Sequence, residues 1–172
     1  AGQAIQIVTW PNEANHGLYP RQYQIRSETG ELLLRAVSIW TLMDSQTRKM
    51  VHCSELAGRL WWADEQDMPL PQSIKPMQTQ KTIRRLARPE EMDQNRHINN
   101  ANYVRWLEPL LPEGYALEHR LRTFQINYVA ELYPQDAVEL HYDMDADVMK
   151  VEGHSGGRRS FAVLAQFVKN NI

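Results

Sequence analysis

The chain has 172 residues, a length that suits one ordinary domain or one domain with part of a second. Hydrophobic residues make up 42% and charged residues 23%, which is typical of a globular protein and excludes a fibrous or highly charged disordered chain. The formal net charge of −2 provides no overall basic field, which argues against a nucleic-acid partner.

The composition also indicates a cellular compartment. Cys53 is the only cysteine, so no internal disulfide can form and we expect a reducing compartment, a bacterial-type cytoplasm. The longest apolar stretch, residues 32–43, is interrupted by Arg35, so we expect no membrane span. The first four residues do not combine a basic region with an apolar one, and we expect no signal peptide.

The first fifty residues have the pattern of strands. Alternating apolar and polar positions predict strands near residues 5–10 and 22–26. A turn at 27–31, where Gly30 can adopt a positive φ, leads into a long and mostly buried strand at 32–43. Two antiparallel strands joined by a short glycine turn form a hairpin, which we expect here.

The next segment, residues 54–80, is irregular in period and punctuated by prolines, which predicts a linker with one short helix near its start. Trp61 and Trp62 are expected to hold this linker against a domain. The chain therefore divides into a segment of strands only at 1–53, the linker, and a second unit at 81–172.

The second unit combines strands with one helix. Alternating apolar and polar residues predict a strand at 82–88 and three later strands. A helix is predicted to begin after Asn99 or Asn100 and to end before Pro112. Its apolar side chains recur at helical spacing: Tyr103, Trp106, Leu107, Leu110 and Leu111. We therefore expect an α+β arrangement in which a curved antiparallel sheet wraps around one helix, with the first unit an incomplete repeat.

The loop 93–97 (Asp-Gln-Asn-Arg-His) is the main candidate for chemistry. It places Asp93, Asn95 and His97 at alternating positions just before the helix, whose first N–H groups carry a partial positive charge. N–H donors can stabilise the oxyanion of a thioester while a carboxylate activates water or attacks directly. A polar loop that only caps turns has the same composition, and composition alone favours that structural role.

Glu131 follows the predicted strand at 120–130 and allows two interpretations. It is either a solvated structural carboxylate or a second acid that faces the Asp93 loop. Two neighbouring carboxylates raise the pKa of one of them, which suits acid–base chemistry near neutral pH.

Two other motifs fail on their own requirements. The loop at 93–97 resembles the start of a calcium loop, but Ile98 stands where that loop needs Gly and its twelfth position is not Glu, so we expect no metal. Residues 153–157 match a nucleophile elbow, but no Asp, Glu or His follows Ser155 to complete a triad. We expect a hairpin turn there.

The remaining candidates are weaker. Cys53 could act as a nucleophile only beside a His and an orienting group, and a partly buried, unreactive thiol is more common. No phosphate-binding loop or dinucleotide fingerprint occurs, so no cofactor is expected. The basic pairs 84–85 and 158–159 form a solvated surface or a contact for an acidic carrier protein.

Residues 93–108 resemble the signature of the acyl-acyl carrier protein (acyl-ACP) thioesterase family, in which an Asp-x-Asn-x-His-x-Asn-Asn loop runs into a helix with Tyr and Trp. Residues 128–131 match the family's Tyr-x-x-Glu, and several segments between residues 9 and 48 fit the end of its first repeat. The motifs occur in the family's order and cover most of the chain except the linker.

The resemblance implies a double hotdog fold, in which each antiparallel sheet wraps around a long central helix. It implies hydrolysis of a fatty acyl group from the phosphopantetheine arm of acyl carrier protein, which ends chain elongation. By position, Asp93, Asn95, His97 and Glu131 match the family's catalytic set. We expect the two carboxylates to activate water, Asn95 and His97 to orient the water and thioester, and helix N–H groups to hold the oxyanion.

Some roles stay open within this resemblance. Asp93 could instead attack as a nucleophile. Some plant members carry Cys where this chain has Leu132, so the sequence favours carboxylate chemistry over a cysteine mechanism. Hydrolysis of acyl-CoA and acyl binding without hydrolysis are the alternative functions, and a homodimer is a candidate assembly.

The chain departs from the family at its beginning. The family's first repeat starts with a strand and its own helix, which have no counterpart here, so we expect a fragment of a longer protein or a truncated gene. The missing helix would leave an apolar face of the first sheet uncovered.

Overall fold

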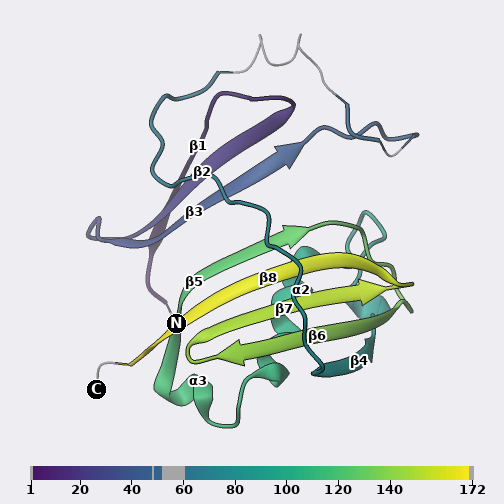
Figure 1. Cartoon of the computed structure of the whole chain (residues 1–172). Helices are drawn as coiled ribbons and strands as arrows, with labels where there is room; N and C mark the ends of the chain where they lie inside the picture. The colour runs from purple at the N-terminus through teal and green to yellow at the C-terminus, as the bar shows by residue number, and fades with distance from the viewer. Residues whose placement is uncertain (1, 48, 52–60, 171–172) are drawn as a thin grey trace. The chain divides into compact units, whose positions relative to one another are not determined.

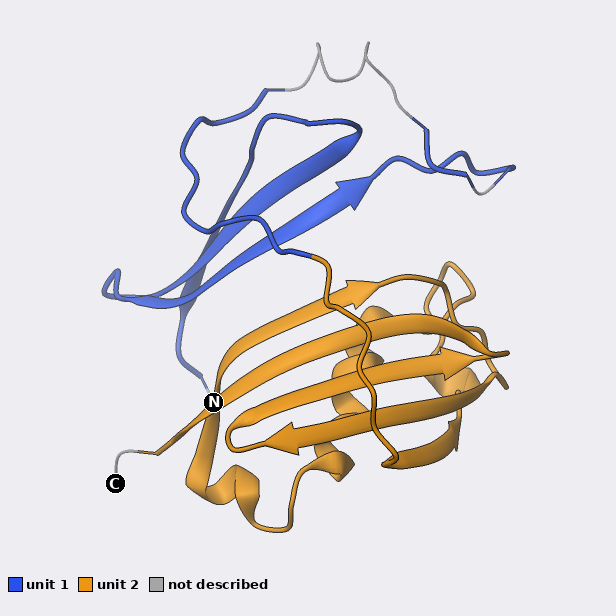
Figure 2. Ribbon diagram, viewed as in Figure 1, with its two compact units in different colours: residues 1–72 blue, residues 73–172 orange. Residues whose placement is uncertain are grey.

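The structure is a computed structural model that describes residues 2–47, 49–51 and 61–170; Figure 1 labels its strands and helices. The chain divides into two compact units, residues 1–72 and 73–172, coloured separately in Figure 2. This division falls inside the segment that the sequence marks as a linker. Cys53 and the short helix predicted near the start of that linker lie outside the described residues.

The first unit is a three-stranded antiparallel sheet. Its strands β1 (Ile5–Pro11), β2 (Leu18–Ser27) and β3 (Leu32–Thr41) follow one another in the order β1-β2-β3 (Figure 1). Gly30 between β2 and β3 has a φ of 87°, a conformation that glycine adopts without steric cost. The hairpin expected from the sequence is confirmed.

On one face of this sheet, side chains form hydrogen bonds with the segment that follows β3. Gln22 is fully buried, and its amide nitrogen donates to the Asn12 side chain at 2.9 Å and to the Met68 carbonyl at 3.2 Å. The Trp10 indole donates to the Glu65 carbonyl at 2.8 Å. Trp61 and Trp62, which the sequence predicts to hold the linker, line a cavity beside Trp40 of this sheet, although Trp61 is 71% exposed. The buried Gln22 and the partly buried Asn12 therefore bond the sheet to residues 63–68.

The opposite face of the same sheet is apolar and exposed. The strand register places Ile7, Ile25 and Leu34 in one row across the three strands, with Trp40 further along on the same face. Ile7, Leu34 and Trp40 are 62%, 48% and 60% exposed. Within the described part of this unit no helix covers them, as the sequence led us to expect.

The second unit is a five-stranded sheet in which every neighbouring pair is antiparallel. Its strand order is β4-β6-β7-β8-β5, as Figure 1 shows. The strands are β4 (Thr82–Leu86), β5 (His119–Tyr128), β6 (Ala137–Asp145), β7 (Val148–Ser155) and β8 (Arg158–Lys169). Residues 156–157 turn β7 directly into β8, so the segment at 153–157 ends a hairpin strand and is no nucleophile elbow.

Several short helices belong to this unit, and the main one packs against the inner side of its sheet. The main one, α2 (Asn100–Arg105), is capped by the Asn99 side chain, which accepts from the Ala101 N–H at 2.9 Å. It is much shorter than predicted, because Pro109 has no N–H to continue the ladder; a 3-10 helix, η2 (Glu108–Leu110), follows. The other helices are η1 (Pro89–Glu91) and α3 (Tyr115–Glu118).

The core of the second unit lies between α2 and the sheet. Tyr103 and Trp106 are each 2% exposed, and the Tyr103 ring meets Phe161 of β8 edge-on at 4.8 Å between centroids. The Phe161 ring packs against Gly153 of β7, where an added Cβ would come within 1.9 Å of the ring. One buried helix against one antiparallel sheet is the α+β layer arrangement that the sequence predicts.

Residues 73–81, which we call the strap, cross the outer face of this sheet (Figure 1). The Ile74 N–H donates to the Asn127 side chain of β5 at 2.9 Å, and the Met77 N–H donates to Glu152 of β7 at 3.3 Å. The Thr79 hydroxyl donates to the Tyr142 carbonyl of β6 at 3.0 Å. The last part of the predicted linker is therefore bonded to the second sheet. Among the residues that the structure describes, no helix is long and apolar enough to cross a membrane.

Candidate active site

The loop at 93–97 is a tight reversal of the chain between η1 and α2. Its two sides are joined at the base, where the Asn99 N–H donates to the Glu91 carbonyl at 2.9 Å and Met92 forms a β-bridge with Ile98. At the tip the Asp93 N–H donates to the His97 carbonyl at 2.9 Å. This closure brings the side chains of Asp93 and His97 together, with Oδ2 and Nδ1 3.7 Å apart.

Glu131 approaches the same imidazole from its other side. Its Oε1 lies 3.7 Å from His97 Nε2, and its Oε2 accepts a 2.8 Å hydrogen bond from the Tyr133 hydroxyl. The side chains of Asp93, His97 and Glu131 are 22%, 23% and 32% exposed, so water and a substrate can reach them. The structure thus places His97 between two carboxylates, which brings together three of the four residues singled out in the sequence.

Asn95, the fourth residue, lies at the exposed tip of the loop. Its backbone N–H donates to Asp93 Oδ1 at 2.7 Å, which makes an Asx turn. Arg96 follows with a φ of 67°, in the left-handed region that non-glycine residues rarely adopt. The structural role that composition favours is therefore present as well: one oxygen of Asp93 stabilises the turn, while the other faces His97.

The start of α2 offers less to an oxyanion than the sequence suggests. The Ala101 N–H donates to the Asn99 side chain and the Asn102 N–H donates to the Asn99 carbonyl, both at 2.9 Å. These two N–H groups are already satisfied by the cap, so the role predicted for them gains no support here.

Glu91, two residues before Asp93, is a partly buried residue near the site that the sequence analysis missed. Its Oε1 accepts from Arg85 at 2.7 Å and from the Trp106 indole at 2.8 Å, and its Oε2 accepts from the Arg88 N–H at 2.8 Å. Burial raises the pKa of Glu91, but the three donors and the charge of Arg85 outweigh it, and the net pKa lies below its usual value.

Arg85 is the cationic partner in this group. Its guanidinium lies 4.0 Å from the centre of the Trp106 ring, and burial lowers its pKa although the charge of Glu91 opposes that shift. Its neighbour Arg84 is 82% exposed, whereas Arg85 is 24% exposed. Successive residues of a strand point to opposite faces of the sheet. This alternation could have shown in the sequence that one arginine of the pair is exposed and the other is not.

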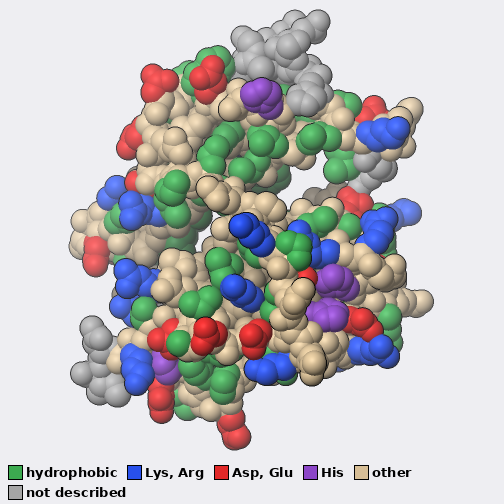
Figure 3. Space-filling model, viewed as in Figure 1, with side chains coloured by type: hydrophobic (Ala, Val, Ile, Leu, Met, Phe, Trp, Pro, Cys, Tyr) green, Lys and Arg blue, Asp and Glu red, His purple; other side chains and the backbone are tan. Residues whose placement is uncertain are grey.

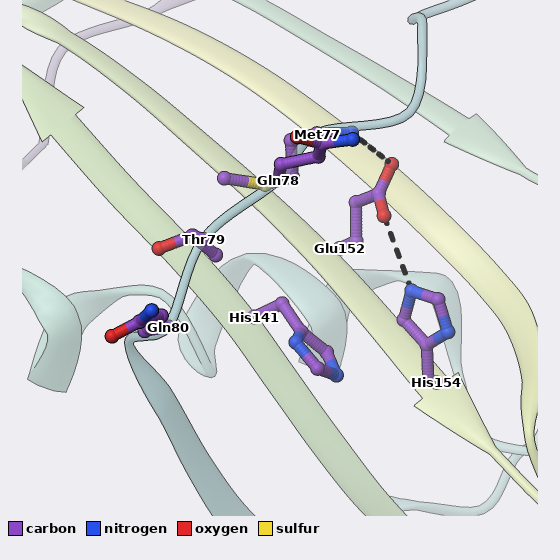
Figure 4. A pocket seen from close by; sticks show the side chains of 7 residues that line it. All are labelled: Met77, Gln78, Thr79, Gln80, His141, Glu152 and His154. Atoms are coloured by element: carbon purple, nitrogen blue, oxygen red, sulfur yellow. Dashed lines mark hydrogen bonds and ion pairs between the residues drawn. The ribbon is translucent and has the colours of Figure 1, made fainter.

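A second group of titratable side chains lies under the strap, on the outer face of the sheet. Figure 4 shows His141, Glu152 and His154 beside residues 77–80, around a cavity of about 550 Å³. Glu152 is 5% exposed; it accepts from Arg159 at 2.9 Å and contacts His154 Nε2 at 3.1 Å. The rings of His141 and His154 contact each other edge to face. Figure 3 shows two His side chains side by side among charged side chains. No group of three or more His, Cys, Asp or Glu side chains in the described part of the chain could hold a metal.

Comparison with known sequences identifies the family. The sequence pattern of the acyl-ACP thioesterase C-terminal domain matches residues 74–159, and that of the acyl-ACP thioesterase N-terminal domain matches residues 1–56. The chain therefore belongs to the acyl-ACP thioesterase family, as its motifs predict.

Individual relatives are distant and longer. An oleoyl-acyl carrier protein thioesterase of Coriandrum sativum is 26% identical over 171 residues, which cover 88% of this chain and 46% of the relative. A palmitoyl-acyl carrier protein thioesterase of Arabidopsis thaliana is 25% identical over 140 residues, 76% of this chain and 34% of the relative. The chain thus spans less than half the length of these curated relatives.

Solved structures confirm the hotdog fold. An acyl-ACP thioesterase from Bacteroides thetaiotaomicron superposes with a TM-score of 0.86 at 21% identity, covering 96% of this chain and 69% of that one. A 12:0-ACP thioesterase from Umbellularia californica gives a TM-score of 0.80 at 20% identity, covering 98% and 69%.

Proposed function

We propose that the protein hydrolyses fatty acyl-ACP thioesters to free fatty acid and acyl carrier protein, and so ends fatty-acid chain elongation. The observation that supports this proposal is the position of His97, whose two ring nitrogens each lie 3.7 Å from a carboxylate oxygen, of Asp93 on one side and of Glu131 on the other. It occurs in a chain that belongs to the acyl-ACP thioesterase family.

In the proposed reaction the two carboxylates activate a water molecule, which loses a proton and adds its oxygen to the thioester carbonyl carbon. The carbonyl becomes an oxyanion, and its collapse breaks the carbon–sulfur bond. The proton held by the carboxylate passes to the leaving thiolate of the phosphopantetheine arm. Separations of 3.7 Å exceed a direct hydrogen bond, and such contacts commonly tighten when substrate binds.

His97 and Asn95 orient the reactants in this scheme. The imidazole of His97 lies between the two carboxylates, so its position sets their spacing around the water. Asn95 stands at the exposed tip of the loop, where its side chain can meet the incoming thioester.

The direct test is hydrolysis of acyl-ACP by the purified protein, produced with any upstream segment that its gene encodes. Asp93→Asn keeps an oxygen that can accept from the Asn95 N–H, so the turn survives while the carboxylate is lost. We expect kcat to fall by about 10³-fold or more. Gln94→Ala, an exposed change in the same loop, is the matched control and should leave kcat unchanged. Undiminished turnover by Asp93→Asn rules out the assigned role.

The same assay separates the alternative substrates. Rates on matched acyl-CoA and acyl-ACP thioesters give the carrier preference, which we propose is for acyl carrier protein. An acyl-binding role without hydrolysis is favoured by an apolar cavity of about 620 Å³ in the first unit, whose lining includes Trp40, Trp61 and Trp62. Fatty-acid binding by a parent protein that releases no product would establish that role instead.

Location and assembly belong to the same proposal. We place the protein in a reducing compartment such as a bacterial cytoplasm, on the basis of its single cysteine. A homodimer stays a prediction, which light scattering on the eluted protein tests.

A further inference from the structure

We propose that Glu91 is a positioning residue for the thioesterase reaction: it fixes the base of the Asp93 loop to α2 and β4 and so sets the spacing around His97. This inference rests on the proposed function of that loop. Glu91 itself lies outside the group of Asp93, His97 and Glu131, and its carboxylate faces Arg85 and Trp106.

The backbone of Glu91 closes the loop. Its carbonyl oxygen accepts two hydrogen bonds, from the Asn99 N–H at 2.9 Å and from the buried Asn102 side chain at 2.8 Å. The next rungs toward the tip are the Met92–Ile98 bridge and the hydrogen bond from the Asp93 N–H to the His97 carbonyl. A shift of Glu91 is therefore passed along the same short ladder to Asp93.

The side chain of Glu91 ties this ladder to the rest of the unit. Oε1 accepts from Arg85 of β4 and from Trp106 immediately after α2, while Oε2 accepts from the Arg88 N–H. Glu91 thus joins a strand, a helix and the turn before the loop through one carboxylate that is 15% exposed. Low exposure limits screening by solvent, so these charge-assisted bonds hold their geometry.

The three donors require a carboxylate at this position. All of them are N–H groups, and both oxygens of Glu91 act as acceptors. A glutamine has one acceptor oxygen, so its NH₂ group would face an N–H donor at one end and break that contact. Arg85 would also keep its charge but lose the carboxylate that faces it. Its Nε already has no hydrogen-bond partner in the described structure.

The test compares Glu91→Gln with the parent protein on acyl-ACP, using Glu90→Gln as the matched control. Glu90 is adjacent and 69% exposed, and it meets Arg88 only at 4.0 Å. For Glu91→Gln we expect kcat to fall about 10- to 100-fold while KM changes less than threefold, because a misplaced loop costs rate without removing substrate contacts. Glu90→Gln should keep the parent values.

A purely structural role would lower the yield or melting temperature but leave kcat of the folded fraction intact, so the folded fraction must be measured by circular dichroism or size-exclusion chromatography beside the rates. If Glu91→Gln does not fold, Trp106→Phe removes one donor to Glu91 while keeping a ring in the core, and kcat should fall threefold or more. A folded variant of either kind with kcat and KM of the parent overturns the inference.

The outcomes separate this inference from the proposed function. Parent activity that is lost in Asp93→Asn but kept in Glu91→Gln supports the function and rejects the positioning role. A parent protein that hydrolyses no thioester rejects both.

Discussion

The backbone N–H of Ile98 donates a 2.7 Å hydrogen bond to the carbonyl oxygen of Leu132. Ile98 directly follows His97, and Leu132 directly follows Glu131, so this bond joins the two segments that carry the candidate chemistry. Both side chains are 1% exposed and belong to the core of the second unit. The meeting of His97 and Glu131 is therefore built on buried packing.

We predict that Glu131→Gln removes most of the thioesterase activity, with kcat at least about 100-fold lower, because the second carboxylate is lost while its shape remains. Tyr133→Phe should have a smaller effect, up to about 10-fold, since it removes the 2.8 Å hydrogen bond to Glu131 Oε2. Steady-state kinetics on acyl-ACP measure both, with the exposed Glu108→Gln as control. A Tyr133→Phe variant that is less active than Glu131→Gln would contradict this order.

Much of the fold was accessible from sequence because it depends on local patterns. Alternation found most strands of both units, and Gly30 marked a turn that requires a positive φ. It missed β7 (Val148–Ser155), because only three strands were expected after the helix. The length of α2 was overestimated because the apolar spacing from Tyr103 to Leu111 continues through Pro109, whose missing N–H ends the helix.

The motifs predicted residues of the candidate site but not the contacts that the fold creates between distant segments. Asp93 and His97 share a loop, and their closeness follows from a short reversal of the chain. The contact of Glu131 with His97 depends on how β5 leaves the sheet, which no local pattern encodes. Glu91 was missed for the same reason: its partner Arg85 lies on a different element, and only the folded unit shows that the two meet at 2.7 Å.

We predict that Glu152→Gln destabilises the second unit by about 2–4 kcal/mol, because Arg159 loses the charge that faces it in a buried position. Thermal or urea unfolding measures this change. Glu139→Gln, on the same outer face but paired with the 82% exposed Arg84, should cost less than about 0.5 kcal/mol. Equal effects of the two substitutions would show that the low exposure of the Glu152–Arg159 pair adds nothing to stability.

The loss in Glu152→Gln should depend on pH. Burial raises the pKa of Glu152, but hydrogen bonds from Arg159, His154 and the Met77 N–H outweigh it, so the folded pKa lies below the ordinary value of 4.5. The ionised carboxylate therefore stabilises the folded protein fully above that value, and this contribution is lost as the pH falls through the folded pKa. The stability difference between parent and variant should be largest near neutral pH and shrink below pH 4.5. A difference that grows on acidification would have the wrong sign.

We predict that Gly153→Ala is strongly destabilising, since the new methyl group would come within 1.9 Å of the Phe161 ring. Overpacking of this kind costs about 1–3 kcal/mol or more. Phe161→Leu removes the ring, so the cost of Gly153→Ala should be smaller in the double variant than in the parent background. A double-mutant cycle from urea unfolding gives the coupling. Simple additivity of the two changes would show that the contact does not limit this position.

The backbone at Arg96 gives the last prediction. Its φ of 67° lies in the left-handed region, which costs a non-glycine residue about 1–2 kcal/mol, and β-branched residues fit it worst. Arg96→Gly and Arg96→Asn accept this conformation, so both should keep the fold and kcat on acyl-ACP, whereas Arg96→Val should lower both stability and kcat. The comparison separates the effect of backbone conformation from that of charge. All three variants lose the guanidinium, but only Arg96→Val disfavours the left-handed conformation. If kcat falls equally in all three, the arginine charge itself contacts the substrate, and the geometry of the Asp93–His97 reversal is not what this residue provides.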